Sequence, residues 1–216
     1  MKSIIFDLDG TLLDSLEDLY VSTNYVLKEM HLPPRSREEV RSFVGNGARI
    51  LMGKAIGEGE AARIEEALAL FRAHYGAHSA DHTRPYPGIP ALLDRLQREG
   101  YGMAIVSNKP DFAVKDLCRE YFPQVSLCLG DREGVARKPA PDAVWEAMKL
   151  LSSEPQECVY VGDSEVDVAT AQNARIPCVA VLWGFRDRSV LGAQGATFFA
   201  DSADALYERI SEAMGK

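Results

Sequence analysis

The sequence predicts an α/β fold in which a doubly wound parallel sheet carries an inserted bundle of helices. Short runs that are apolar throughout and rich in branched residues recur along the chain, and they suit strands buried on both faces of a parallel sheet. Helical patterns separate these runs from about Pro87 onward, as expected for strands joined by right-handed crossovers. One long segment near the start of the chain shows helical periodicity and no strand run, so we expect it to form the bundle.

The expected strands are five short runs in which apolar residues follow one another without polar alternation. They are Ser3–Phe6, Met103–Val106, Val125–Leu129, Cys158–Val161 and Cys178–Leu182. Two stripes of apolar residues at helical spacing lie in the same strand-and-helix part of the chain. The first ends before a helix stop at Gly100, and the second is at the C-terminus. Their apolar positions are Ile89, Leu92, Leu93 and Leu96, and then Leu206, Ile210 and Met214.

The helical segment, residues 15–82, divides at two points. Pro33-Pro34 separates two helices, and the tetrapeptide GEGE at Gly57–Glu60 separates two more. Ser36, followed three residues later by Glu39, has the spacing of a capping box at a helix N-terminus. The segment therefore predicts a small bundle of short helices.

The boundaries of the insert follow from where its helical pattern stops. The stretch RPYPGIP at Arg84–Pro90 has the composition of a hinge through which the chain would return to the sheet. We therefore expect an α/β core of residues 1–14 and 84–216 and an inserted helical cap of residues 15–83. Gly76 and the approaching hinge are expected to end the last cap helix. A row of histidines spaced by four is then expected to be a solvated cap edge and not a metal site: His74, His78 and His82.

Composition narrows the classes of partner and location. Apolar residues make up 46% of the 216 residues and charged residues 26%, which is ordinary for a globular protein with a core. The net charge of −8 disfavours a nucleic-acid partner, and no apolar run approaches the ~20 residues that span a bilayer, so no membrane is expected. Four widely spaced cysteines and the lack of a basic-then-apolar leader predict a cytoplasmic protein with reduced thiols. Both a monomer and a homodimer stay open.

Polar side chains gather where the expected strands end. In chain order they are Asp7, Asp9, Ser107, Asn108, Lys109, Lys138, Asp163 and Asp167. Ligands of open α/β sheets bind outside the carboxyl ends of the strands, so we expect these groups to meet. Clustered carboxylates repel one another and suit a hard cation such as Mg²⁺, which shares its remaining ligands with phosphate. The pattern predicts a phosphoryl-transfer site in which Lys138 offsets negative charge and Ser107 and Asn108 donate to phosphoryl oxygens.

Four short motifs resemble those of the haloacid dehalogenase superfamily, in the order and at the spacing typical of it. They are DLDGT at Asp7–Thr11, SN at Ser107-Asn108, KP at Lys138-Pro139 and GDSEVD at Gly162–Asp167. The resemblance implies a Rossmann-like core with a small helical cap. It also implies an Mg²⁺-dependent phosphohydrolase that acts on a small phosphorylated metabolite. The dehalogenases of the superfamily lack the second aspartate, so Asp9 favours phosphoryl transfer over carbon–halogen cleavage.

The same resemblance implies roles for single residues. Asp7 is the implied nucleophile, which forms an aspartyl-phosphate, and Asp9 is the implied general acid and base. Asp7, the main-chain carbonyl of Asp9 and Asp163 would hold Mg²⁺. Ser164 and Asp167 would support the surroundings of the metal, or Lys138, without ligating directly. The phosphate would be bound by Gly10, Ser107, Asn108 and Lys138.

The cap carries one finer resemblance. GNGA at Gly45–Ala48, within Phe43–Ala55, is similar to a segment of the phosphoglycolate phosphatase family. Its glycines would let backbone N–H groups approach an anion, and Asn46 and Arg49 are candidate substrate contacts. We therefore expect 2-phosphoglycolate as the substrate. A plain loop-to-helix turn is the alternative interpretation of this segment.

Other functions share parts of this pattern. A phosphomutase like β-phosphoglucomutase would use the same aspartyl-phosphate, with a cap that excludes water. Pyrophosphatases and nucleotidases of the superfamily carry related caps. A phospho-accepting receiver domain also places acidic residues and a lysine at sheet ends, but it lacks the large helical insert and the DxD turn.

Overall fold

The computed structural model describes residues 1–215, so Lys216, the last residue of the predicted core segment, lies outside the described residues. The chain divides into two compact units: a core of Met1–Leu13 and the chain from Pro85 onward, and a helical unit of Asp14–Arg84. Two short strands that pair with each other, β2 (Leu13–Asp14) and β3 (Arg84–Pro85), lie where the chain passes between the units. No helix within the described residues combines the length and apolar character that a membrane crossing requires.

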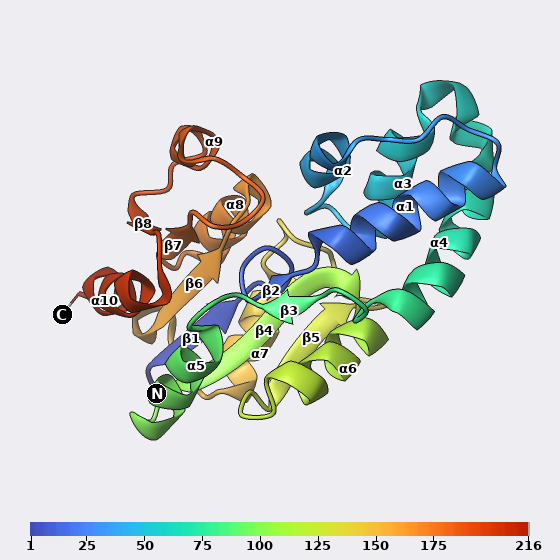
Figure 1. Ribbon diagram of the computed structural model, residues 1–216. Helices are drawn as coiled ribbons and strands as arrows, with labels where there is room; N and C mark the ends of the chain where they lie inside the picture. Colours follow the sequence, from blue (N-terminus) through green and yellow to red (C-terminus); the bar gives the residue numbers. More distant parts are fainter. Residues whose placement is uncertain (216) are drawn as a thin grey trace. The chain divides into compact units, whose positions relative to one another are not determined.

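A six-stranded sheet forms the centre of the core (Figure 1). Its strand order is β5-β4-β1-β6-β7-β8, and neighbouring strands are parallel. The strands are β1 (Ser3–Phe6), β4 (Gly102–Pro110), β5 (Leu127–Asp131), β6 (Cys158–Gly162), β7 (Cys178–Val181) and β8 (Phe198–Ala200). The order reverses beside β1, which confirms the predicted doubly wound parallel sheet.

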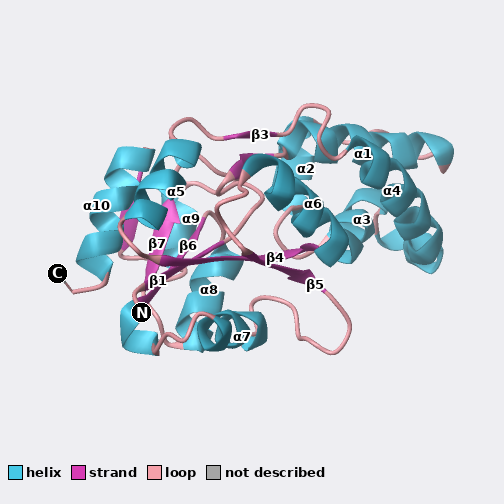
Figure 2. Cartoon of the chain, turned by 90° about the horizontal axis from the view of Figure 1, so that it is seen from below, coloured by secondary structure: helices cyan, strands magenta, loops and turns pink. Residues whose placement is uncertain are grey.

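Helices cover both faces of this sheet, with α7 and α8 on one face and α5, α6 and α10 on the other (Figure 2). The helices of the core are α5 (Ile89–Arg98), α6 (Asp111–Tyr121), α7 (Asp142–Leu150), α8 (Glu165–Ala174), α9 (Arg188–Ala193) and α10 (Ala203–Ala213), with a 3₁₀ turn at Pro155–Glu157. Ile5 of β1 and Tyr160 of β6 are fully buried and pack in one cluster with Val144 and Ala147 of α7. Such burial contributes about 25 cal/mol for each Å² of apolar surface removed from water.

The helical unit contains α1 (Leu16–Glu29), α2 (Arg37–Phe43), α3 (Ala48–Ile56), a 3₁₀ helix (Glu58–Arg63) and α4 (Ile64–His78). The predicted capping box is confirmed: the Ser36 hydroxyl accepts from the N–H of Glu39, and the Glu39 carboxylate accepts from the N–H of Ser36 at 2.8 Å. The prediction that Gly76 ends the last helix is wrong, because α4 continues to His78. A glycine inside a helix costs only about 1 kcal/mol relative to alanine, which packing of Phe71 and Tyr75 on the buried face outweighs.

Two strands of the six-stranded sheet differ from their predicted ranges by two residues or more, and a third strand was not predicted. β4 continues to Pro110 instead of ending at Val106, because a register shift between these two residues keeps the strand paired with β5. β5 begins at Leu127, two residues later than expected. The sequence pattern did not predict β8, because an edge strand of three residues leaves too short an apolar run to recognise.

Candidate active site

Three neighbouring strands bring the candidate residues to one edge of the sheet. Asp7 follows β1, Asp163 follows β6, and the last residues of β4 include Ser107–Lys109. β1 lies between β4 and β6 and is parallel to both, so the carboxyl ends of all three strands meet. The strand order reverses there, which is where open α/β sheets bind ligands.

Lys138 is buried between two carboxylates. Its Nζ donates to Oδ1 of Asp7 at 2.7 Å, to Oδ1 of Asp167 at 2.8 Å and to the hydroxyl of Tyr160 at 3.0 Å. Burial opposes its charge, but Asp167 and Asp7 outweigh that effect and hold the pKa of Lys138 well above its ordinary value. Lys138 therefore stays a cation and fixes both carboxylates.

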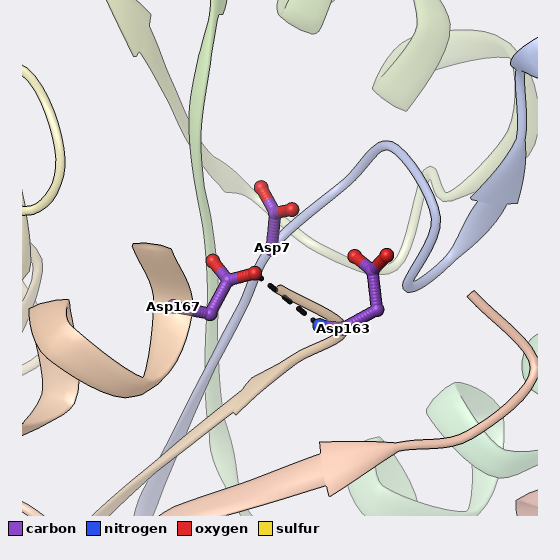
Figure 3. Close-up of side chains that lie close together, drawn as sticks. All are labelled: Asp7, Asp163 and Asp167. Atoms are coloured by element: carbon purple, nitrogen blue, oxygen red, sulfur yellow. Dashed lines mark hydrogen bonds between the residues drawn. The ribbon is translucent and has the colours of Figure 1, made fainter. Parts of the chain in front are cut away.

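Asp7, Asp163 and Asp167 form a cluster of buried carboxylates (Figure 3). One oxygen of each lies within 4.8 Å of the corresponding oxygens of the other two. Burial, followed by the charge of Asp167, raises the pKa of Asp7 to about 7, although Lys138 opposes the rise. Burial and the charges of Asp167 and Asp7 likewise raise the pKa of Asp163 well above its ordinary value. Carboxylates crowded in this way favour a proton or a cation between them.

Asp167 already accepts hydrogen bonds on both oxygens. Oδ2 accepts from the N–H of Asp163 at 3.2 Å, drawn dashed in Figure 3, and from the N–H and hydroxyl of Ser164 at 3.0 and 2.6 Å. Oδ1 accepts from Lys138 and from the hydroxyl of Tyr160, the latter at 3.2 Å. Ser164 is also the N-cap of α8 and forms a capping box with Asp167. Asp167 thus fixes both the loop that follows β6 and the side chain of Lys138. Because these bonds occupy its oxygens, it has less capacity to bind a cation than Asp7 and Asp163.

Two glycines, Gly10 and Gly184, lie directly against the side chain of Asp163. A Cβ placed on Gly10, which has a φ of +88°, would lie 2.4 Å from Oδ2 of Asp163, and one on Gly184 would lie 2.3 Å from its Cβ. The Thr11 hydroxyl donates to Oδ1 at 3.0 Å and the N–H of Phe185 donates to Oδ2 at 2.7 Å. Any larger residue at either glycine would therefore displace this carboxylate.

Asp9 and Lys109 form a partly buried ion pair that the sequence pattern did not predict. Nζ of Lys109 donates to Oδ1 of Asp9 at 2.8 Å and to Oδ2 at 3.1 Å. The two side chains are only 3% and 13% exposed for Lys109 and Asp9 respectively. They are 100 residues apart in the sequence and meet because β1 and β4 are neighbours. The one available signal was the lysine that directly follows the SN motif.

Ser107 and Asn108 bind backbone groups in this structure. Oγ of Ser107 accepts from the N–H of Lys109 at 3.2 Å. Oδ1 of Asn108 accepts from the N–H of Lys138 at 2.9 Å, and its Nδ2 donates to the carbonyl of Lys138 at 3.0 Å. Asn108 thereby fixes the loop that carries Lys138. Phosphate binding by these two residues stays a prediction.

Asn46 and Arg49, the candidate contacts of the cap, belong to the helical unit. Asn46 lies between Gly45 and Gly47, both of which have positive φ, in the turn between α2 and α3. Arg49 forms an ion pair with Glu65 of α4. Its observed partner is therefore a carboxylate of the protein, and substrate binding by either residue stays a prediction.

Each histidine of the row has its own polar partner. The Nδ1 distances are 3.0 Å from His74 to Ser22, 2.8 Å from His78 to Asp81 and 2.8 Å from His82 to Asp18. The row therefore makes three separate contacts within the helical unit.

Comparisons with known proteins agree with this fold. The model of a family described as haloacid dehalogenase-like hydrolase matches residues 4–181. The phosphoglycolate phosphatase of Pseudomonas putida is 35% identical over 95% of this chain and 78% of its own length. That of Vibrio parahaemolyticus is 32% identical over 98% and 96%. A solved structure from Lactobacillus delbrueckii subsp. bulgaricus, described as a candidate phosphoglycolate phosphatase, superposes with a TM-score of 0.90 at 34% identity, covering 97% of this chain and 98% of the other. The chain belongs to the haloacid dehalogenase-like hydrolases, and within them it is a phosphoric monoester hydrolase.

Proposed function

We propose that the chain is an Mg²⁺-dependent phosphatase that hydrolyses 2-phosphoglycolate through an aspartyl-phosphate at Asp7. The position of Asp7 carries the proposal. Its carboxylate is buried, held on one oxygen by Lys138 and clustered with Asp163, and Asp9 follows two residues later. This arrangement suits phosphoryl transfer, in which positioning and charge neutralisation supply most of the catalysis.

The donor set at this edge fits Mg²⁺. Asp7 and Asp163 offer carboxylate oxygens, the ligands that Mg²⁺ prefers, and the raised pKa of each indicates negative charge that the protein alone does not offset. The main-chain carbonyl of Asp9 is the third expected ligand. When bound, the ion would neutralise charge on the phosphoryl oxygens.

In the first half-reaction, Asp7 attacks phosphorus with the carboxylate oxygen that does not bind Lys138. A bond forms between that oxygen and phosphorus while the bond from phosphorus to the leaving oxygen breaks. Asp9 gives its proton to the leaving oxygen, so the product departs as an alcohol. Lys138 keeps Asp7 in line and offsets the charge that develops.

In the second half-reaction, ionised Asp9 takes a proton from a water molecule, whose oxygen attacks phosphorus. The bond between Asp7 and phosphorus breaks, inorganic phosphate is released and the carboxylate is restored. The phosphoryl group would be bound throughout by Gly10, Ser107, Asn108 and Lys138, and Asn108 also keeps the Lys138 loop in position.

The choice of 2-phosphoglycolate rests on the relatives and on the GNGA segment. Proteins named phosphoglycolate phosphatase match nearly the whole chain. In this proposal the helical unit, Asp14–Arg84, has the role of a cap, and its Asn46 and Arg49 contribute to substrate selection.

The test is phosphate release from a panel of phosphate compounds, measured with Mg²⁺ and with a chelator. We expect kcat/KM for 2-phosphoglycolate to exceed that for hexose phosphates, nucleoside monophosphates and pyrophosphate by about tenfold or more. Activity should disappear with the chelator. Metal-independent hydrolysis would contradict the proposal. An isomerised product without phosphate release would indicate a mutase, and a stable phosphoprotein without turnover would indicate a receiver domain.

A further inference from the structure

Lys109 brings a buried positive charge to the site that the proposed reaction does not use. Its side chain is 3% exposed, at the end of β4, and its Nζ contacts both carboxylate oxygens of Asp9. Removing an ammonium group from water is costly, and a polar residue facing solvent would avoid that cost. The charge lies beside Asp9, the proposed acid. In the proposed reaction the leaving group departs on this side of the site.

Two buried lysines lie at this edge of the sheet, one beside each of the two proposed catalytic aspartates. The buried lysines of the described chain are Lys109 and Lys138. Lys138 is held by Asp7 and Asp167, on the side of the nucleophile. A substrate with a phosphate dianion and a carboxylate adds about three negative charges, of which only those on the phosphoryl group would be met by Lys138 and a metal.

Asp9 defines where the leaving group lies. As the proposed acid it must come within hydrogen-bond reach of the leaving oxygen, so an ammonium 2.8 Å from Asp9 lies close to the atoms attached to that oxygen. In 2-phosphoglycolate the carboxylate carbon is two covalent bonds beyond the leaving oxygen, which places the carboxylate oxygens about 3 Å away. An ammonium carries three donors and can hold Asp9 and a second carboxylate together.

We propose that Lys109 binds the carboxylate of the leaving group and thereby selects phosphomonoesters with a negative charge beside the ester oxygen. This inference rests on the proposed function and names the core residue that recognises the part of the substrate that does not react. Lys109 has a specificity role, because a substrate with an uncharged leaving group lacks the contact but keeps every contact to the phosphoryl group.

The test compares 2-phosphoglycolate with 2-hydroxyethyl phosphate, in which an alcohol replaces the carboxylate, at the same Mg²⁺ concentration. The ratio of the two kcat/KM values is measured for the wild type, Lys109→Met and Lys115→Met. Lys115 is a matched control because it is an exposed lysine of α6, bound to Asp111 at 2.6 Å. We expect the ratio to fall by about 10- to 100-fold in Lys109→Met, as for the loss of one charge-assisted hydrogen bond. It should not change in Lys115→Met.

Two results would overturn the proposal. An equal fall in kcat/KM for both substrates would mean that Lys109 acts only through Asp9, and an unchanged ratio in Lys109→Met would mean that it does not contact the leaving group. A wild type without preference for 2-phosphoglycolate would contradict the proposed substrate instead, so the two failures are distinguishable.

Lys109→Met leaves the carboxylate of Asp9, which is only 13% exposed, without its cation. A second pair of variants therefore serves as a control for misfolding of Lys109→Met. Asp9→Asn and the double variant Asp9→Asn/Lys109→Met differ at Lys109 alone, and the double variant buries neither charge. In calorimetry, Asp9→Asn should bind 2-phosphoglycolate about tenfold more tightly than the double variant does. The two variants should bind 2-hydroxyethyl phosphate with equal affinity. Equal binding of 2-phosphoglycolate by the two variants would overturn the proposal.

Discussion

Asp18 in the helical unit and Asp7 in the core are buried aspartates whose surroundings shift their pKa values in opposite directions. Asp18 is 2% exposed and Asp7 is 8% exposed. The pKa of Asp18 is lowered, whereas that of Asp7 is raised to about 7. Burial alone raises the pKa of a carboxyl group, so the difference comes from the atoms that each carboxylate meets.

Asp18 meets hydrogen-bond donors. It accepts from the N–H of His82 at 3.0 and 3.1 Å, from the N–H of Thr83 at 2.8 Å and from the Thr83 hydroxyl at 2.7 Å. Burial raises its pKa, but the bonds from Thr83 and His82 outweigh that effect. They also tie the first turn of α1 to the end of the helical unit, so Asp18 has a structural role.

Asp7 meets other carboxylates, and Lys138 alone among its principal charged neighbours opposes the rise in its pKa. A carboxylate whose charge the fold does not satisfy is available for a metal or for chemistry. The groups around a buried aspartate, and not its burial, therefore determine whether its pKa is lowered, as in Asp18, or raised, as in Asp7.

The largest difference between the two aspartates is expected from Asp7→Asn, which should abolish activity. An amide cannot form the aspartyl-phosphate, so phosphate release should fall by about 10⁴-fold or more. Because the folded pKa of about 7 lies above the ordinary 3.8, the wild type loses stability as the pH rises through 7. The variant lacks this loss. In urea unfolding at pH 8 without metal, its free energy of unfolding should exceed that of the wild type by about 1 kcal/mol or more.

The matched control is Asp116→Asn, at a 66% exposed side chain that pairs with Arg119 on α6. Its activity and stability should stay near those of the wild type. Turnover of Asp7→Asn above about 1% of the wild-type rate would contradict the covalent role.

Asp18→Ala should destabilise without changing the chemistry. It leaves the donors of His82 and Thr83 without their acceptor, which should lower the free energy of unfolding by about 2–4 kcal/mol. The folded pKa of Asp18 lies below 3.8, so its contribution is present above that pH and is lost as the pH falls through the folded pKa. Urea unfolding from pH 7 to pH 2 should therefore show the variant and the wild type converging in acid.

Asp81→Ala is the control within the same unit, because Asp81 is 51% exposed and pairs with His78. It should change the free energy of unfolding by less than about 1 kcal/mol. If Asp18→Ala differs from the wild type equally at pH 7 and pH 2, the carboxylate is not the source of the stability.

The smallest expected effect is the dependence of Mg²⁺ stabilisation on pH. Mg²⁺ at about 100 times its Kd should add about 2.7 kcal/mol of stability, or about 5–10 °C in Tm. Protons compete for Asp7, whose pKa is about 7, so the rise in Tm should be larger at pH 8 than at pH 5.5. KCl at matched ionic strength is the control. An equal rise at both pH values would place the ion away from Asp7.

Most of the sheet could be predicted from the sequence because its strands are buried on both faces. β1, β6 and β7 lie within one residue of their predicted ends, since continuous apolar runs of this length have few alternative placements. β8 was missed because its three residues pair only with β7 at the sheet edge. Its register comes from the sheet and not from its own pattern.

The candidate site could be predicted only in part. The strand-end positions of Asp7 and Asp163 follow from local pattern. The contact of Lys109 with Asp9 and that of Tyr160 with Lys138 do not, because the partners are 100 and 22 residues apart. The sequence pattern of the apolar strand that contains Tyr160 is the same whether or not the tyrosine hydroxyl bonds to a lysine.

The sequence by itself determined that the runs of β1, β6 and β7 form strands of the sheet and that a helix begins at the Ser36 capping box, because each depends on neighbours along the chain. The tertiary structure alone decided which carboxylates share a lysine, which are crowded together and which receive donors. Those outcomes depend on the order of strands in the sheet and on burial, and these set the pKa of Asp7 and Asp18 in opposite directions.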